Sequence, residues 1–299
     1  MASVLSKGTL FPAELTRELF NLVRGKSSLS VLSGQTPVSF AGNEVFTFNF
    51  DNEVDLVAEN GVKSNGGATI TPVTIRPVKI EYGFRTSDEF MTASEDYQLE
   101  ILRAFSDGFA AKAARGLDIM AMHGYNPRTG SASPVIGTNH FDSVVNQTVT
   151  ATTSANADIE TAVALVQGND HEITGAIISP KTKGDLAKEV YAGSGLPMFP
   201  ELAWGGSPES IHGLRTEFNG TVFFGTTPVD LAIVGNFRDF FRWGVAKDVS
   251  IEVIEYGNPD NDATAGDLKG HNQVYLRGEM YIGWGILVPN AFARIIFHK

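Results

Sequence analysis

Phenylalanines alternate with polar residues where the chain first shows a clear strand pattern. Phe46, Phe48 and Phe50 fall on one side of this strand, and polar residues fall on the other. Alternation resumes after the turn-rich segment ENGVKSNGG and continues to residue 84. The pattern predicts a long hairpin over residues 45–84. Two prolines in its second half are typical of strands that lie outside a main sheet.

Apolar residues recur at helical spacing between residues 97 and 123. The expected buried stripe is Ile101, Phe105, Phe109, Ala113, Leu117 and Met120. A helix of this length would extend about 40 Å. Gly108 and Gly116 lie inside it, and each glycine costs up to about 1 kcal/mol relative to alanine. We therefore expect another segment to pack closely against the helix at both glycines.

The remaining pattern predicts short elements in mixed order. An amphipathic helix over residues 12–24 precedes an extended arm over residues 25–39. Further helices are expected over 158–167 and 180–191, and strands over 172–180, 229–237 and 249–256. A single apolar strand from Val274 to Phe297 closes the chain, with Trp284 between two glycines. An apolar strand of this kind is expected to be packed inside the protein.

Composition and charge narrow the function. The chain has no cysteine among its 299 residues, which excludes disulfides and cysteine-ligated metal sites. Its net charge of −11 argues against tight binding of nucleic acid, because phosphate neutralisation supplies most of the non-specific affinity. We find no signal peptide and no apolar run of about 20 residues, so we expect no association with a membrane.

The sequence carries no recognisable catalytic signature. A phosphate-binding loop and a nucleophile elbow are missing, and the six histidines include no pair at the spacing of a zinc site. We therefore predict no catalytic, cofactor-binding or metal-binding residues. For the three tryptophans, Trp204, Trp243 and Trp284, packing in the core or at a subunit interface is expected rather than ligand stacking.

The order of parts resembles the major capsid protein of tailed bacteriophages, with the HK-ninety-seven-type fold. The segment RTSDEFMTASEDYQLEILRAFSDGFAAKAARGLDIMAMHG looks like the family's connection from the extended loop into the spine helix. GAIISPKTKGDLAKEVYAGSGLPMF is similar to its strand–Pro–helix–Gly unit. IHGLRTEFNG, AIVGNFRDFFRWGV and the closing RGEMYIGWGILVPNAFARI resemble further landmarks. The resemblance covers nearly the whole chain.

The resemblance implies an α+β phage major capsid fold. Its expected parts are an N-terminal arm at 1–40, an extended β-hairpin loop at 41–85, a peripheral domain with the spine helix at 86–130, an α/β axial domain at 131–244, and the return strands of the peripheral domain at 245–299. The arm begins almost at once, so any scaffolding would come from a separate protein.

The resemblance also implies the function. It predicts pentamers and hexamers that form an icosahedral shell around double-stranded DNA without binding it tightly. The location would be the virion, after assembly in the host cytoplasm, and a portal and a decoration protein are further candidate partners. Candidate intersubunit contacts are Phe46, Phe48, Phe50, Lys63 and Trp204. Some relatives form Lys–Asn isopeptide bonds, but only Lys63 has a matching position here, and the alternative is a solvated lysine at a turn.

Two other classes of protein stay open at this point. An encapsulin, a cellular nanocompartment, has the same fold and would hold a cargo peptide rather than DNA. An enzyme with an unrecognised site would show a deep pocket with several convergent ionisable groups.

Overall fold

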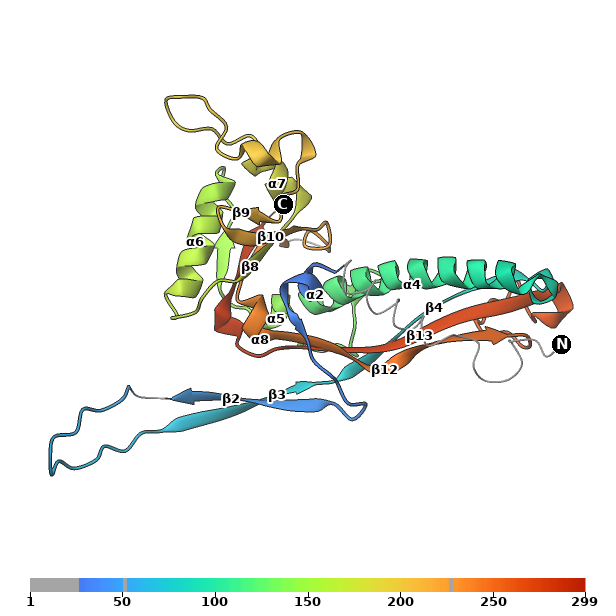
Figure 1. The fold of residues 1–299 in the computed structure, drawn as a ribbon, viewed down its shortest axis with the longest axis horizontal. Coiled ribbons are helices and arrows are strands. Elements are labelled where there is room, and N and C mark those ends of the chain that lie inside the picture. Colours follow the sequence, from blue (N-terminus) through green and yellow to red (C-terminus); the bar gives the residue numbers. More distant parts are fainter. Residues whose placement is uncertain (1–26, 51–52, 226–227, 299) are drawn as a thin grey trace.

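The computed structural model describes residues 27–50, 53–225 and 228–298, and of these the side chains of 49–50, 95–96 and 247–249 are not described. The predicted helix over 12–24 lies outside this part of the chain. The molecule has three parts (Figure 1). A long sheet carries one long helix, a second sheet with its helices forms an upper lobe, and a two-stranded ribbon projects away from both.

The long helix is α4 (Glu95–His123), which confirms the helix predicted over residues 97–123. A short helix, α3 (Glu89–Thr92), precedes it. Gly124 ends α4 in the left-handed conformation with a φ of 68°, and its N–H donates to the carbonyl of Met120. Apart from the partly buried Ile101, the predicted apolar stripe is buried, and α4 contacts β13 of the long sheet.

The long sheet has four strands in the order β1-β12-β13-β4. Their bounds are β1 (Gly34–Gln35), β12 (Phe241–Ile254), β13 (Gln273–Ile286) and β4 (Pro77–Ser87). The central pairs β12–β13 and β13–β4 are antiparallel, whereas β1 runs parallel to β12. The polar segment that joins β12 to β13 contains a short 3-10 helix, η2 (Lys269–His271).

Close packing between α4 and the sheet uses a glycine of the strand, not those of the helix. A Cβ at Gly278 of β13 would lie 3.3 Å from the ring of Phe105 and 3.4 Å from that of Phe109. Gly108 faces open space, and a Cβ at Gly116 would meet Pro127 at an ordinary 3.5 Å. The expectation of close approach at both helix glycines is therefore wrong at Gly108, and at Gly116 it reduces to ordinary contact.

The two glycines beside Trp284 let another segment cross β13. A Cβ at Gly285 would lie 2.8 Å from Ile75, which is fully buried at the root of the ribbon. On the other face, Trp284 points into the core, and its indole N–H donates to the carbonyl of Asn139 at 2.8 Å. The glycines thus make room for Ile75 on one face while the tryptophan fills the core on the other.

The apolar end of the chain is two strands and not one. β13 stops at Ile286, a 3-10 turn, η3 (Pro289–Ala291), follows, and β14 (Phe292–Phe297) enters the other sheet. The interpretation of Val274 to Phe297 as one strand is wrong because Pro289 interrupts it. β14 lies beside strands that the predicted layout assigns to the axial domain, and the domain boundaries stay predictions.

The upper lobe contains a six-stranded sheet in the order β7-β14-β11-β8-β10-β9. Besides β14, its strands are β7 (Thr148–Thr150), β11 (Val229–Gly235), β8 (Gly175–Ile178), β10 (Leu214–Phe218) and β9 (Ser210–Ile211). Helices α6 (Ala155–Gln167) and α7 (Pro180–Leu186) pack on it, and α7 also contacts the 3-10 helix η1 (Pro200–Gly205). Small elements near the joint between lobe and long sheet are α5 (Phe141–Val144), α8 (Phe237–Phe240), β5 (Tyr125–Asn126) and β6 (Ser131–Ala132).

The ribbon is shorter than the hairpin predicted over residues 45–84. β2 (Asn43–Phe50) pairs antiparallel with β3 (Ala68–Ile75), and this pairing ends at Ile75. After residue 76 the chain continues as β4, which pairs with β13 instead. The prediction is wrong in this second half, because burial of Ile75 anchors the ribbon and the next strand takes a different partner.

The arm predicted as extended contains a short helix, α2 (Ser28–Leu32). The hydroxyl of Ser27 accepts from the N–H of Ser30 and so caps its first turn. Leu29 and Leu32 are buried in the main core. The expectation of an extended segment is wrong here, because serine capping and two buried leucines at helical spacing favour one helical turn.

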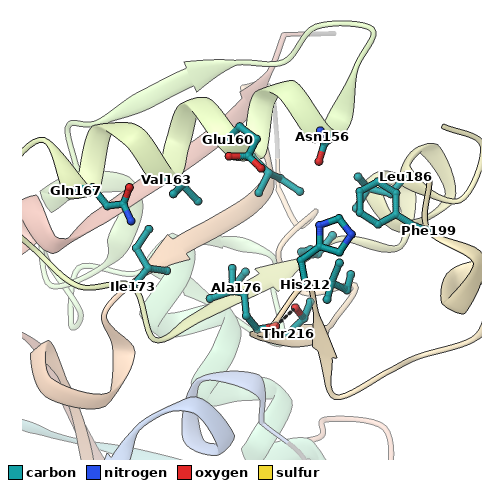
Figure 2. A pocket seen from close by; sticks show the side chains of 14 residues that line it. Asn156, Glu160, Val163, Gln167, Ile173, Ala176, Leu186, Phe199, His212 and Thr216 are labelled. Carbon is teal, nitrogen blue, oxygen red and sulfur yellow. Dashed lines mark hydrogen bonds between the residues drawn. The ribbon is translucent and has the colours of Figure 1, made fainter. Parts of the chain in front are cut away.

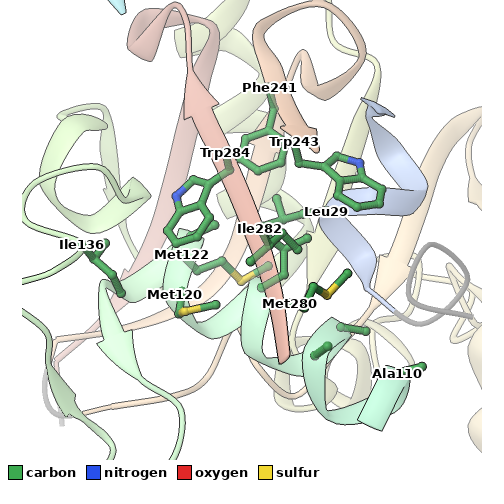
Figure 3. Close-up of a cluster of buried hydrophobic side chains, with 14 of the residues drawn as sticks. Leu29, Ala110, Met120, Met122, Ile136, Phe241, Trp243, Met280, Ile282 and Trp284 are labelled. Carbon is green, nitrogen blue, oxygen red and sulfur yellow. The ribbon is translucent and has the colours of Figure 1, made fainter. Parts of the chain in front are cut away.

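One large apolar core joins α2, α4 and the long sheet to the base of the upper lobe. Trp243 and Trp284 are both 1% exposed and lie on neighbouring strands, which confirms core packing for these two tryptophans. Figure 3 shows both indoles with Phe241, Met280 and Leu29. None of the described helices combines the length and the apolar character needed to cross a membrane.

Candidate assembly interface

The ribbon exposes an apolar face that we name the ribbon stripe: Phe46, Phe48 and Ile70. Their side chains are 55%, 62% and 54% exposed. Phe48 pairs directly with Ile70 across the two strands, so the three residues share one face. The side chain of Phe50 lies outside the described residues. A two-stranded ribbon has no second layer with which to bury such a face.

The loop that joins β2 to β3 forms the free end of the ribbon (Figure 1). Val54, Leu56 and Val62 in this loop are each more than 90% exposed. Lys63 is exposed in the same loop. The position agrees with either role considered for Lys63, so covalent cross-linking stays a prediction.

Trp204 lies in the upper lobe, beside α7, and its side chain is fully exposed. It occupies the left-handed region, with φ 55° and ψ 29°, which is unfavourable for a bulky residue. The ammonium of Lys183 donates to the carbonyl of Gly205 at 3.2 Å and to the hydroxyl of Ser207 at 2.6 Å. The loop thus holds Trp204 in solvent. Trp204 belongs to the upper lobe, whereas the ribbon stripe belongs to the ribbon.

A buried charge cluster, which the sequence analysis missed, joins α4 to the upper lobe. We name it the junction cluster: His123, Asp142, Asp230 and Arg294. Arg294 of β14 binds Asp230 of β11 through two nitrogens, at 2.9 and 3.1 Å, and its Nη2 lies 2.8 Å from Asp142. Nδ1 of His123 lies 2.9 Å from Asp142. The cluster therefore connects the end of α4, α5 and two strands.

The protons of the junction cluster follow from its partners. Nε2 of His123 lies 2.9 Å from the carbonyl of Thr221, which can only accept, so this nitrogen carries a hydrogen. Burial lowers the pKa of His123, but the hydrogen bond and charge of Asp142 outweigh it, and the pKa lies above its ordinary value. With a second proton on Nδ1, two cations face two carboxylates.

The two carboxyls of the cluster behave differently. Burial and then the charge of Asp142 raise the pKa of Asp230 to about 7, against the opposing effect of Arg294. Burial acts in the same direction on Asp142, but His123 and Arg294 outweigh it and hold the pKa of Asp142 below its ordinary value. Asp142 is therefore an anion at neutral pH, and Asp230 is the group that can be protonated near neutral pH.

The junction cluster fits an internal ion-pair network better than a metal centre. Ligand atoms of His123, Asp142 and Asp230 lie within 4.8 Å of one another, which is a spacing that a metal would accept. The guanidinium of Arg294, however, already binds both carboxylates. It supplies the positive charge that a metal would bring, so these residues do not need an ion. The arrangement therefore positions α4 and α5 against the two strands.

A second buried carboxylate, Asp118 of α4, holds the arm. It accepts from the hydroxyl of Ser27 at 2.6 Å, from two N–H groups at the start of α2 at 3.1 and 3.3 Å, and from the amide of Asn219 at 2.7 Å. A carboxylate at a helix N-terminus is a favourable arrangement. Burial nevertheless raises the pKa of Asp118 to about 6. The arm is therefore attached to the long helix through a charged group.

The fold and this distribution of surfaces define a structural subunit, and comparisons with known proteins agree. The model of the phage capsid family matches residues 7–297. The chain therefore belongs to the phage capsid family and is a phage capsid shell protein, a structural component of the virion. No curated protein sequence matches the chain.

Solved structures give the same result. A structure from Mycobacterium phage Ogopogo is 30% identical, with a TM-score of 0.75 over 91% of this chain and 92% of that one. One from Gordonia phage Cozz is 23% identical, with a TM-score of 0.73 over 92% and 87%. The capsid of a native GTA particle, 14% identical, matches 100% of this chain and 95% of its own with a TM-score of 0.66. The fold is the HK-ninety-seven-type capsid fold, as the sequence predicted.

Proposed function

We propose that this protein is the major capsid protein of a tailed bacteriophage, and that its copies form pentamers and hexamers of an icosahedral shell enclosing double-stranded DNA. The ribbon stripe is the observation that carries this proposal. Its apolar side chains are exposed on a ribbon that projects from the body, so a neighbouring subunit is the natural partner. Membership of the phage capsid family supports the same conclusion.

Replacing the stripe tests the proposal. We expect Phe46→Ser with Phe48→Ser to leave a folded subunit, because neither side chain is in the core, and to abolish shells seen by electron microscopy. Glu44→Gln, on the same strand and also exposed, is the matched control and should assemble. Normal shells from the double variant would show that the stripe is not an intersubunit contact.

The contents of the shell distinguish a capsid from an encapsulin. We expect particles to contain nuclease-protected double-stranded DNA and no cargo peptide on the inner surface. Free subunits should bind duplex DNA weakly at physiological salt, because the chain has a net charge of −11. Submicromolar binding in a titration at that salt would contradict enclosure without tight binding.

Other partners follow from the family and need their own tests. A separate scaffolding protein, a portal and a decoration protein are the proposed candidates, and co-expression with neighbouring phage genes would reveal which of them the shell requires. For Lys63 we expect no covalent bond, so assembled particles should dissociate to monomers in denaturing gels. High-mass bands that disappear in Lys63→Arg would establish cross-linking instead.

A further inference from the structure

The upper lobe contains an apolar groove that the proposed function does not explain. It lies between α6 and the strands β8 and β10, and it has a volume of about 280 Å³ (Figure 2). Ile159, Val163 and Ile173 form much of its lining, and Phe199 lies at one end. Glu160 also lines the groove, is exposed, and has no ion pair with another described residue. The groove is thus largely apolar, with Asn156, Gln167, His212 and Thr216 also in its lining and Glu160 as its one carboxylate.

The same lobe exposes an apolar side chain, Trp204, beside a positive charge, Lys183. Trp204 is fully exposed, and the turn behind it is closed, because a Cβ at Gly206 would collide with the carbonyl of Glu201. Lys183 holds this turn through neutral acceptors and lies 4.6 Å from the ring of Phe218. Among the described residues its ammonium has no carboxylate partner. An exposed indole therefore stands beside an uncompensated positive charge.

We propose that Trp204 of one copy inserts into the groove of a second copy, where Lys183 beside the indole pairs with Glu160 of that copy. The inference rests on the proposed self-assembly and adds the residues that make one contact. Polarity and charge agree: an indole meets a largely apolar groove, and an ammonium without a carboxylate partner meets a carboxylate without a cationic partner. Tryptophan in a pocket is also the usual centre of binding energy at interfaces.

The contact is head to tail, because the indole and the groove are different surfaces of one chain. Contacts of this kind generate closed rings when the rotation closes. They therefore suit the pentamers and hexamers of the proposed shell. The groove cannot receive the indole of its own chain in this structure, since Lys183 and the closed turn hold Trp204 in solvent.

Because the chain has no cysteine, an introduced cysteine is the only thiol that a cross-linker can react with. Ala203→Cys places a thiol beside Trp204 without removing the indole, and Gln167→Cys or Asn156→Cys places one on either end of α6 at the groove. Each cysteine variant is purified separately, and the Ala203→Cys protein is then mixed with one groove variant and assembled. A short bismaleimide then links thiols that are close together. We expect dimer bands from Ala203→Cys with at least one groove variant.

Three controls make the result specific. Leu165→Cys, exposed on α6 but not part of the groove, should give at least tenfold less dimer. Trp204→Ala in the cross-linking background should reduce the dimer by a similar factor, and Glu160→Lys with Lys183→Glu on opposite copies should retain it better than either change alone.

Several outcomes overturn the inference. Particles that assemble without the cross-link, or a cross-link that is independent of Trp204, remove this contact but leave the proposed function intact. A groove thiol that links instead to Tyr191→Cys or Leu196→Cys, in the neighbouring exposed loop, assigns the groove to that loop. A wild-type chain that stays monomeric under every assembly condition overturns both the contact and the proposed function.

Discussion

At the residue scale, the junction cluster brings four titratable side chains together where α4 meets the upper lobe. A guanidinium that binds two carboxylates is held between strands of an apolar sheet, so each charge depends on the others. Removing one member leaves its partners buried and uncompensated. This asymmetry gives a clear prediction for Arg294.

We expect Arg294→Met to lower the free energy of unfolding by about 3–5 kcal/mol, the usual cost of breaking a buried ion pair from one side. Chemical denaturation of the subunit measures it. Lys181→Met is the matched control, since its pair with Asp185 is exposed and should contribute about 0–1 kcal/mol. Equal effects in the two variants would show that burial does not strengthen the Arg294 network.

The two glycines of α4 give opposite expectations from similar sequence contexts. Gly108→Ala should raise the free energy of unfolding by roughly 0.5–1 kcal/mol, because the new methyl group meets open space and alanine favours a helix. Gly116→Leu should lower it by about 1–3 kcal/mol, since the longer side chain must displace Pro127. A drop in the melting temperature of Gly108→Ala would contradict this assignment of exposure.

The sequence held a signal for the junction cluster, but not its geometry. Asp230 and Arg294 are single charges inside the apolar runs VDLAIVG and FARIIF, and buried charges are usually paired. Pairing them requires β11 and β14 to be neighbours, although 64 residues separate the two charges. The local sequence pattern does not show which strands are neighbours in a sheet. In addition, the prediction of a single closing strand did not separate β14 from β13.

At the scale of elements, local periodicity predicted an element correctly where the whole pattern lies within one continuous segment. The long helix was predictable because its apolar stripe repeats over about five turns within one segment. The ribbon was predicted too long, because alternation in β3 and β4 looks the same whichever strand is the partner. Only the distant β13 decides that β4 leaves the ribbon.

Deleting the tip of the ribbon, Asn60 to Gly67, should separate folding from assembly. This loop adds no residue to the buried core, so circular dichroism and the melting temperature should stay close to wild type. Shell particles counted by microscopy should fall sharply, because the exposed loop is where a neighbour is expected to bind. A Gly-Ser segment of equal length is the control for the length of the ribbon.

Two results would contradict this role. Normal shells after the deletion would mean that the tip is not an intersubunit strap. A subunit that fails to fold would place the tip in the core, against its exposure in the structure.

At the scale of the whole molecule, buried charged groups lie where the parts of the fold are connected, in addition to those on the surface. Asp118 attaches the arm to α4, and the junction cluster attaches α4 to the upper lobe. Both places combine burial with titratable carboxyls. The relative stability of the folded subunit must therefore depend on pH through these joints.

The sign of that dependence follows from each group. The pKa values of Asp118, about 6, and Asp230, about 7, lie above the ordinary value of aspartate near 3.9, so the folded state binds more protons between about pH 4 and 7. His123 acts in the same direction: its raised pKa gives stability that is complete below about 6.5 and is lost as the pH rises through the folded value. His140 opposes them, because burial lowers its pKa.

We therefore expect the free energy of unfolding of the subunit to increase as the pH falls from 8 to about 5, by an amount on the order of 2 kcal/mol or more. Below pH 4 it should decrease, because Asp142, and Asp260 with a pKa of about 2 beside Arg85, have folded values below their ordinary range and lose their partners on protonation. Denaturation curves across this range measure the profile. Asp118→Asn with Asp230→Asn should flatten the rise between pH 8 and 5, and an unchanged slope in that variant would show that other groups control the acid response.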